Sequence, residues 1–204
     1  MKNNSELIQH LMKEGVLKTE KIIEAFKNID RKNFVLDTYK NECYEDRPLP
    51  IPAEQTISQP TTVAIMLELL QPKKGDKILD VGTGSGWTTA LLAHTVGNTG
   101  QVYGVELHKE LVTFGKKNLS KYSFLNVEIN EASKTLGIPK KAPFDKILVS
   151  AESKDMPSEL IQQLKNNGRM VIPIKNDVVV IDKNKQGKIH TKKIWGFSFV
   201  PLIQ

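Results

Sequence analysis

Residues 77–94 read KILDVGTGSGWTTALLAH. The apolar run at 77–81 has the length of a buried strand, and the apolar and small residues at 87–94 favour a helix. Three glycines at alternate positions, Gly82, Gly84 and Gly86, lie between the two. Glycine permits a tight turn and lets a ligand approach the backbone closely. The stretch therefore predicts the strand–loop–helix unit of an α/β domain with a ligand at the loop.

The alternation continues toward the C-terminus. We expect further strands at 102–105, 127–129, 147–149 and 170–174, with helices at 109–119 and 157–165 among them. Strands that alternate with helices form a largely parallel sheet. No helix is expected between the last two runs, 178–181 and 189–200, so the sheet should end with an antiparallel C-terminal strand. Trp195, Phe197 and Phe199 alternate in the last run, which predicts one buried strand face.

The residues before the glycine loop differ in character. Residues 3–30 have helical periodicity broken at Gly15, and we expect an N-terminal helical cap over residues 1–42. Residues 43–60 (CYEDRPLPIPAEQTISQP) contain four prolines, which exclude a helix and indicate an ordered, extended strap. Pro60 suits the first turn of another helix. Residues 61–204 would form the α/β core, so that the 204 residues make a single domain.

Composition narrows the class of protein. Hydrophobic residues make up 39% of the chain and charged residues 25%, as in globular proteins. No apolar run approaches the ~20 residues of a membrane helix, and the N-terminus lacks the apolar core of a secretory signal. The single cysteine, Cys43, excludes an internal disulfide and a thiolate metal cluster, and the four histidines are dispersed. We expect a cytoplasmic protein without a metal or a membrane partner.

The net charge of +6 comes from 29 basic and 23 acidic residues. The lysines are scattered, and the only arginines are Arg31, Arg47 and Arg169. Base readout in DNA depends largely on arginine. We therefore expect no nucleic-acid partner, and we expect a monomer.

An acidic residue follows the glycine loop at an informative distance. Glu106 ends the next expected strand, about 20 residues beyond the loop, where a carboxylate can accept two hydrogen bonds from a ribose diol. The loop has GxGxG spacing and departs from the GxGxxG fingerprint of dinucleotide sites. Asp80, the loop and Glu106 together resemble the S-adenosylmethionine site of class I methyltransferases, whose fold is Rossmann-like. The alternatives are a glycine turn needed only for packing, and a nicotinamide-binding domain.

Further motifs extend the resemblance over essentially the whole chain. Residues 46–51 (DRPLPI) and 55–60 (QTISQP) precede the glycine loop, and APFD at 142–145, GRMVIP at 168–173 and FVPL at 199–202 follow it. In this order and spacing they resemble the protein-L-isoaspartate O-methyltransferase family. The resemblance implies methyl transfer from S-adenosylmethionine to the α-carboxylate of L-isoaspartyl residues in damaged proteins and peptides. The ester would then close to a succinimide, whose hydrolysis partly restores aspartate.

The resemblance also implies site residues. Ser58 falls on the family's active-site serine. The implied cofactor-binding positions are Gln55, Thr56, Ile57, Ser58, Thr61, Asp80, Gly82, Thr83, Gly84, Ser85, Gly86, Glu106, Leu107, Glu131 and Ala132.

The chemistry agrees with an active site that has no general base. A carboxylate acceptor with a pKa of about 3–4 is ionised at neutral pH. Ser58 is therefore expected to orient the acceptor and not to act as a nucleophile. Considered without the family, Ser58 would be the N-cap of the helix that begins at Pro60.

Some positions depart from the family's pattern. Pro52 and Glu54 stand where the family usually has glycine, and residues 130–132 (NEA) replace a glycine-flanked aspartate. Thr61 stands where some members have histidine, and Glu54 would bring a negative charge toward a carboxylate acceptor. The alternatives are a methyltransferase of this fold with another peptide carboxylate or a small molecule as acceptor, an RNA methyltransferase, and an inactive cofactor-binding adaptor.

Overall fold

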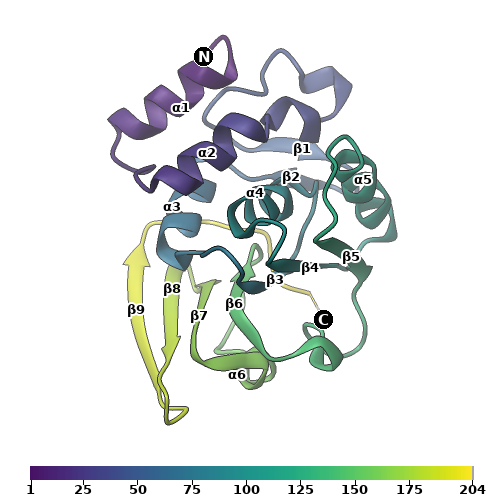
Figure 1. Cartoon of the computed structure of the whole chain (residues 1–204). Coiled ribbons are helices and arrows are strands. Elements are labelled where there is room, and N and C mark those ends of the chain that lie inside the picture. The colour runs from purple at the N-terminus through teal and green to yellow at the C-terminus, as the bar shows by residue number, and fades with distance from the viewer. Residues whose placement is uncertain (204) are drawn as a thin grey trace.

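The computed structural model describes residues 1–203 and contains one seven-stranded sheet (Figure 1). The strands lie in the order β5-β4-β3-β6-β7-β8-β9. Their bounds are β3 Lys77–Val81, β4 Gln101–Glu106, β5 Val127–Glu131, β6 Phe144–Val149, β7 Leu164–Ile174, β8 Asp177–Lys183 and β9 Ile189–Trp195. Strands β3 to β7 are parallel, and β8 runs antiparallel to both of its neighbours. The expected parallel sheet with an antiparallel C-terminal strand is confirmed.

The two faces of the sheet are covered unequally. Helices α3 (Pro60–Leu70), α4 (Trp87–Val96) and α5 (Lys109–Leu119) contribute to the larger apolar cluster on one face. Helix α6 (Ser158–Gln163) contributes Leu160 to the smaller cluster on the other face. Strand β8 serves both clusters, because consecutive side chains of a strand point to opposite faces. This double burial explains the continuous apolar run at 178–181.

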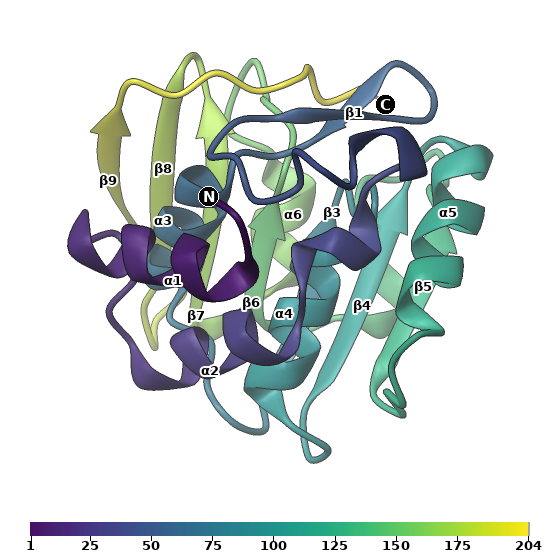
Figure 2. The ribbon, with the colours of Figure 1, turned by 90° about the horizontal axis from the view of Figure 1, so that it is seen from above.

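The N-terminal helical cap is also present. Helices α1 (Asn4–Lys13) and α2 (Glu20–Asn28) contact α3 and α4 from outside the sheet (Figure 2). The Asn3 side chain accepts a hydrogen bond from the Glu6 amide at 2.9 Å and so caps α1. Two short 3-10 helices, η1 (Arg31–Phe34) and η2 (Asp37–Tyr39), lead from α2 into the strap.

The strap is extended, as expected, and contains a small hairpin. Strand β1 (Leu49–Ile51) pairs antiparallel with β2 (Gln55–Ile57). At the turn the Gln55 amide donates to the Pro52 carbonyl at 3.3 Å, and Ala53 and Glu54 have φ of 58° and 56°. The left-handed positions are thus 53 and 54, and proline at 52 lies outside them.

Two expectations about the C-terminal half are wrong. The helix expected over 157–165 ends at Gln163, because Leu164 already pairs with Phe144 of β6 as the first residue of β7. Trp195, Phe197 and Phe199 do not form a buried strand face, since β9 ends at Trp195 and that side chain is 79% exposed. Phe197 and Phe199 follow in a coil, where their rings stack with centroids 6.4 Å apart.

The coil after β9 crosses the carboxyl edge of the sheet toward the β1–β2 hairpin (Figure 2). Three backbone hydrogen bonds anchor it: the Phe197 amide donates to the Asn176 carbonyl at 3.1 Å, the Glu152 amide to the Val200 carbonyl at 2.7 Å, and the Leu202 amide to the Glu152 carbonyl at 2.8 Å. We call residues 196–203 the tail. The tail therefore lies at the sheet edge where the pocket described below opens.

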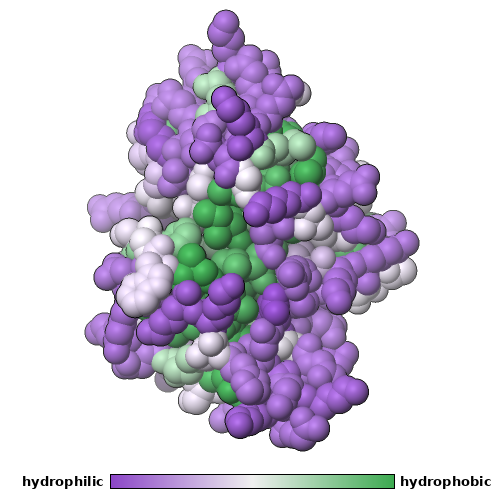
Figure 3. Space-filling model, turned by 90° about the vertical axis from the view of Figure 1, so that its left-hand side faces the viewer, coloured by the Kyte–Doolittle hydropathy of each residue, from purple (hydrophilic) through white to green (hydrophobic). Residues whose placement is uncertain are grey.

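Strand β9 is one edge of the sheet. Figure 3, which views the side on which β9 lies, shows apolar surface in the middle, framed by polar side chains. The exposed residues of β9 include Lys192 and Lys193. Charged side chains on an edge strand discourage pairing with another chain. Within residues 1–203, no helix is long and apolar enough to cross a membrane.

Candidate functional site

One pocket opens at the carboxyl ends of β3 and β4. Its walls include residues 55–58 of the strap, 81–85 of the glycine loop, 105–108, 132–137, and 200–203 of the tail. The space between these walls, including the open mouth, is about 1060 Å³. That is large enough for a cofactor together with part of an acceptor. The carboxyl edge of the strands is also where open α/β sheets bind their ligands.

The glycine loop has a backbone that only glycine adopts without strain. Gly82, Gly84 and Gly86 have φ of 79°, 52° and 84°. A Cβ on Gly86 would meet the Gly115 carbonyl oxygen of α5 at 3.2 Å. Gly86 is the N-cap of α4, so the first turn of that helix lies at the pocket. The expected strand–loop–helix unit is confirmed, and Gly82, Thr83, Gly84 and Ser85 line the pocket, whereas Gly86 lies behind them.

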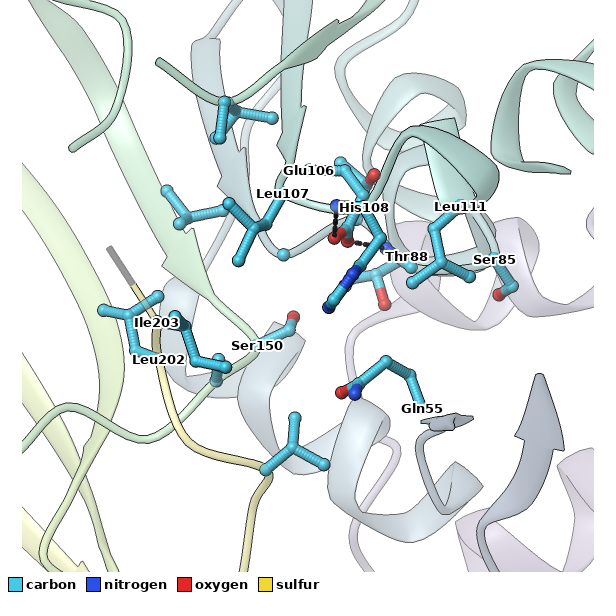
Figure 4. Close-up of a pocket in the computed structure, with 18 of the residues that line it drawn as sticks. Gln55, Ser85, Thr88, Glu106, Leu107, His108, Leu111, Ser150, Leu202 and Ile203 are labelled. Atoms are coloured by element: carbon cyan, nitrogen blue, oxygen red, sulfur yellow. Dashed lines mark hydrogen bonds between the residues drawn. The ribbon is translucent and has the colours of Figure 1, made fainter. Parts of the chain in front are cut away.

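Glu106 is held in one orientation at the pocket wall. Its side chain is buried, with 6% of the residue exposed. Oε2 accepts from the Gly84 amide at 2.9 Å and Oε1 accepts from the His108 amide at 3.1 Å (Figure 4). Each carboxylate oxygen has a second lone pair, so both can accept another hydrogen bond. The carboxylate can therefore receive a pair of hydroxyl groups from a ligand while the loop keeps it in place.

Asp80 lies beneath the pocket and not in its wall. The residue is fully buried, and Oδ2 accepts from the Thr89 hydroxyl at 2.6 Å. The pKa of Asp80 is raised to about 7, mainly by burial; the hydrogen bond from Thr89 opposes this rise and the nearby charge of Glu106 adds to it. Among residues 1–203, Oδ1 finds no hydrogen-bond partner. Asp80 thus links the end of β3 to α4 through Thr89.

The strap supplies another wall of the pocket. Gln55, Thr56, Ile57 and Ser58 all line the pocket. Ser58 is not the cap of α3, because the N-cap position is Gln59, whose side chain makes no capping hydrogen bond. Asp46 serves the helix end instead, since its carboxylate accepts from the Thr61 amide at 2.9 Å and from the Thr61 hydroxyl at 2.7 Å. Thr61 is therefore engaged outside the pocket wall.

The last residue of β5 and the residue that follows it have different placements. Ala132 lines the pocket, and its amide donates to the Glu106 carbonyl at 2.7 Å. Glu131 lies outside the lining, with Oε1 3.6 Å from the Lys109 ammonium and half of its side chain exposed. Leu107 lies in the wall beside Glu106 (Figure 4). A direct contact of Glu131 with the cofactor stays a prediction.

Several pocket residues were not anticipated from the sequence. They are Ile51, Val81, Thr88, Val105, His108, Leu111, residues 133–137, Ser150, Ala151 and residues 200–203. Trp87, whose position directly after the glycine loop makes it a candidate wall residue, also lines the pocket. Figure 4 shows Leu202 and Ile203 across the cavity from Gln55. His108 could have been noticed because it follows Glu106 so closely. The tail gave no local signal, because its position depends on where the chain returns after β9.

No metal centre accompanies the pocket in the part of the chain that the structure describes. Within residues 1–203, no three His, Cys, Asp or Glu side chains are grouped as metal ligands. Cys43 is a buried free cysteine, and burial raises the pKa of its thiol.

Comparisons with known proteins agree with this geometry. The family model for protein-L-isoaspartate(D-aspartate) O-methyltransferase (PCMT) matches residues 2–204. The protein-L-isoaspartate O-methyltransferase of Pyrococcus horikoshii is 42% identical over 201 residues, which cover 96% of this chain and 90% of that protein.

Solved structures show the same likeness. A protein-L-isoaspartate O-methyltransferase structure superposes with a TM-score of 0.88 at 26% identity, covering 98% of this chain and 66% of that chain. A Plasmodium falciparum protein assigned to the same activity, in complex with S-adenosyl-L-homocysteine, superposes with a TM-score of 0.86 at 25% identity, covering 100% of this chain and 99% of that chain. The chain therefore belongs to the protein-L-isoaspartate(D-aspartate) O-methyltransferase family, and it is a class I methyltransferase that uses S-adenosylmethionine.

Proposed function

We propose that this chain methylates the α-carboxylate of L-isoaspartyl residues in damaged proteins and peptides, with Ser58 orienting the acceptor and the loop with Glu106 holding the cofactor. The observation that carries the proposal is that one pocket joins the strap residues 55–58 to the glycine loop and Glu106. Both partners of a methyl transfer can therefore meet in one cavity.

The residues on the cofactor side fit S-adenosylmethionine. The Glu106 carboxylate has free acceptor capacity for a ribose diol, and the glycine loop exposes backbone beside it. Thr83 Oγ1 is buried without a partner among the described residues, so a polar ligand atom could satisfy it. When bound, S-adenosylmethionine supplies an electrophilic methyl group.

On the acceptor side, Ser58 offers a hydroxyl that can donate to a carboxylate. An isoaspartyl α-carboxylate is ionised at neutral pH, so the chain needs only to bind it and align it. Alignment of two reacting groups can lower a barrier by about 7–11 kcal/mol. This account agrees with a pocket whose only ionisable wall residues are Glu106, His108 and Lys134 within residues 1–203.

Pro52 and Glu54, which depart from the family's pattern in the strap, are compatible with a carboxylate acceptor. Glu54 is exposed at the hairpin tip and is not one of the residues that line the pocket. Its charge therefore projects into water, where repulsion of a bound carboxylate is weak. Pro52 precedes the left-handed positions, so proline does not prevent the turn.

A pair of synthetic peptides tests the proposed acceptor. The two peptides are identical except that one contains an isoaspartyl linkage and the other an aspartyl linkage. We expect base-labile label from methyl-labelled S-adenosylmethionine on the isoaspartyl peptide only. Equal labelling of both peptides, or of neither while the cofactor still binds, would refute the acceptor and leave the methyltransferase class intact. Label on RNA would indicate the alternative acceptor class.

Two substitutions separate the proposed roles. Ser58→Ala should lower turnover of the isoaspartyl peptide and leave the affinity for S-adenosyl-L-homocysteine nearly unchanged. Glu106→Ala should weaken that affinity by about tenfold or more, because hydrogen bonds to a charged group are lost. Titration calorimetry and initial rates measure the two effects. A loss of cofactor affinity in Ser58→Ala as large as in Glu106→Ala would remove Ser58 from the acceptor side.

We further propose a cytoplasmic, monomeric enzyme that needs no metal. Lys192 and Lys193 are exposed on the edge strand β9 and discourage pairing with another chain there, which supports a monomer. Because the acceptor carboxylate is already ionised, no metal is needed to generate the nucleophile. Cell fractionation tests the cytoplasmic location, light scattering tests the monomeric state, and activity after treatment with a chelator tests the independence from metal.

A further inference from the structure

Arg31 is a buried cation that the methyl-transfer chemistry does not use. The residue is 0% exposed in η1, at the point where the helical cap leads into the strap. Among the described residues, no carboxylate lies within hydrogen-bonding distance of its guanidinium. A buried charge without an ionic partner is costly unless its hydrogen bonds are made. The groups that bind the guanidinium must therefore offset the cost of burying its charge.

The guanidinium binds the strap through backbone carbonyls. Nη1 donates to Cys43 at 2.9 Å and to Glu45 at 3.1 Å, and Nη2 donates to Arg47 at 3.0 Å and to Ser58 at 3.0 Å. Three acceptors precede the β1–β2 hairpin and the fourth follows it. The guanidinium thus closes the base of the hairpin and fixes the backbone of Ser58 relative to the start of the strap.

The same guanidinium contacts the helix that follows the glycine loop. Its Cζ lies 5.4 Å from the centroid of the Trp87 ring, and Trp87 is the first residue of α4. The Trp87 indole also donates to the Ile29 carbonyl at 3.4 Å, just before η1. Cation–π contact is favourable where both groups are desolvated. Arg31 therefore bridges the strap, with Ser58, and the start of α4, beside the cofactor loop.

We propose that Arg31 is a positioning residue that sets Ser58 and the strap at the correct distance from the cofactor loop. This inference rests on the proposed function, because it assigns the strap to the acceptor. Lysine does not replace arginine here. Its ammonium is a single point with three donors, whereas the planar fork of Arg31 reaches four carbonyls at once.

The test compares Arg31→Lys with Arg169→Lys. Arg169 is a matched control, because its guanidinium also binds a backbone carbonyl, that of Leu69, together with Gln71 and Asp182, far from the strap in the chain. In Arg31→Lys we expect kcat/KM for the isoaspartyl peptide to fall by about tenfold to a hundredfold, as for the loss of charged hydrogen bonds. The affinity for S-adenosyl-L-homocysteine should change little. Amide exchange should accelerate in peptides covering 43–58 and stay unchanged in β3 and β4.

Other results would overturn the inference. They are an unchanged kcat/KM in folded Arg31→Lys, the same loss in Arg169→Lys, or faster exchange throughout the sheet with an equal loss of cofactor affinity. If Arg31→Lys does not fold, Arg31→Gln, which keeps two donors without the charge, replaces it. Failure of both to fold would assign Arg31 to overall stability and overturn its positioning role.

The exchange and binding measurements do not depend on the acceptor. If the wild type leaves the isoaspartyl peptide unlabelled, the proposed function fails. The rate of amide exchange in residues 43–58 of Arg31→Lys then still decides whether Arg31 orders the strap.

Discussion

Two residues at the tip of the β1–β2 hairpin have backbone angles that glycine favours. Ala53 and Glu54 have φ of 58° and 56°. The left-handed region costs an L-residue about 1–2 kcal/mol, because Cβ approaches the following carbonyl oxygen. This cost explains why glycine would suit position 54, whereas proline at 52, outside the left-handed positions, is tolerated.

Glu54→Gly should stabilise the protein. Relief of the left-handed strain exceeds the added flexibility of the unfolded chain, so the expected net gain is up to about 1 kcal/mol. Thermal unfolding would then shift upward by about 2–4 °C. Glu54→Ala is the matched control, because it removes the charge and keeps the strain. Equal melting temperatures for the two variants would contradict the explanation.

Single residues also show how far sequence reasoning reaches. The position of Glu106 followed from a short segment, since it ends the strand after the glycine loop, and the structure places it in the pocket wall. The orientation of the Glu131 side chain could not be predicted in this way, because it depends on how β5 pairs with β4 and on the ion pair with Lys109. Arg31 gave no local signal, because its four acceptors are spread from 43 to 58.

At the scale of elements, helix α3 is capped from a distance. Its own N-cap residue, Gln59, makes no capping bond, and Asp46 of the strap binds the Thr61 amide and hydroxyl instead. Asp46 therefore joins the strap to α3 just after Ser58, and Arg31 binds the backbone carbonyl of Ser58 itself. A sequence-local search finds Ser58 as the cap because it does not detect a cap 15 residues upstream.

Asp46→Ala should destabilise the fold by about 0.5–2 kcal/mol, the usual cost of a lost helix cap. Chemical denaturation measures the change in the free energy of unfolding. Asp37→Ala provides the control, since Asp37 is an exposed acid in η2 whose partner is Lys40 on the surface. We expect the control to unfold like the wild type. An Asp46→Ala protein as stable as the control would show that the helix end needs no cap.

The boundaries of elements were less predictable than their existence. Each of the five parallel strands includes its predicted run, and helices α3 to α5 begin where they were predicted, but β6 begins at Phe144 and β7 at Leu164, ahead of the runs expected at 147–149 and 170–174. The end of α6 was wrong, because β7 begins in a polar segment, LKNNG, whose pairing with β6 begins through Leu164. The sequence predicts only extended backbone for the β1–β2 hairpin, since each of its strands has three residues and β1 contains a proline.

At the scale of the whole molecule, the site is assembled from distant parts of the chain. The strap and the tail form two walls of a pocket whose floor is the glycine loop and Glu106. The alternation of strands and helices predicted the sheet and the edge at which a ligand binds. It did not predict the tail, because a coil that crosses a sheet edge is fixed by hydrogen bonds to a distant loop at Glu152.

The fate of an isoaspartyl peptide over repeated rounds of methylation tests the repair function of the whole chain. The isoaspartyl peptide and its aspartyl counterpart are separated by chromatography during prolonged incubation with S-adenosylmethionine. We predict that the isoaspartyl form declines while the aspartyl form accumulates, and that Ser58→Ala slows both changes. An isoaspartyl peptide that remains constant while S-adenosylmethionine is consumed would contradict the proposed function.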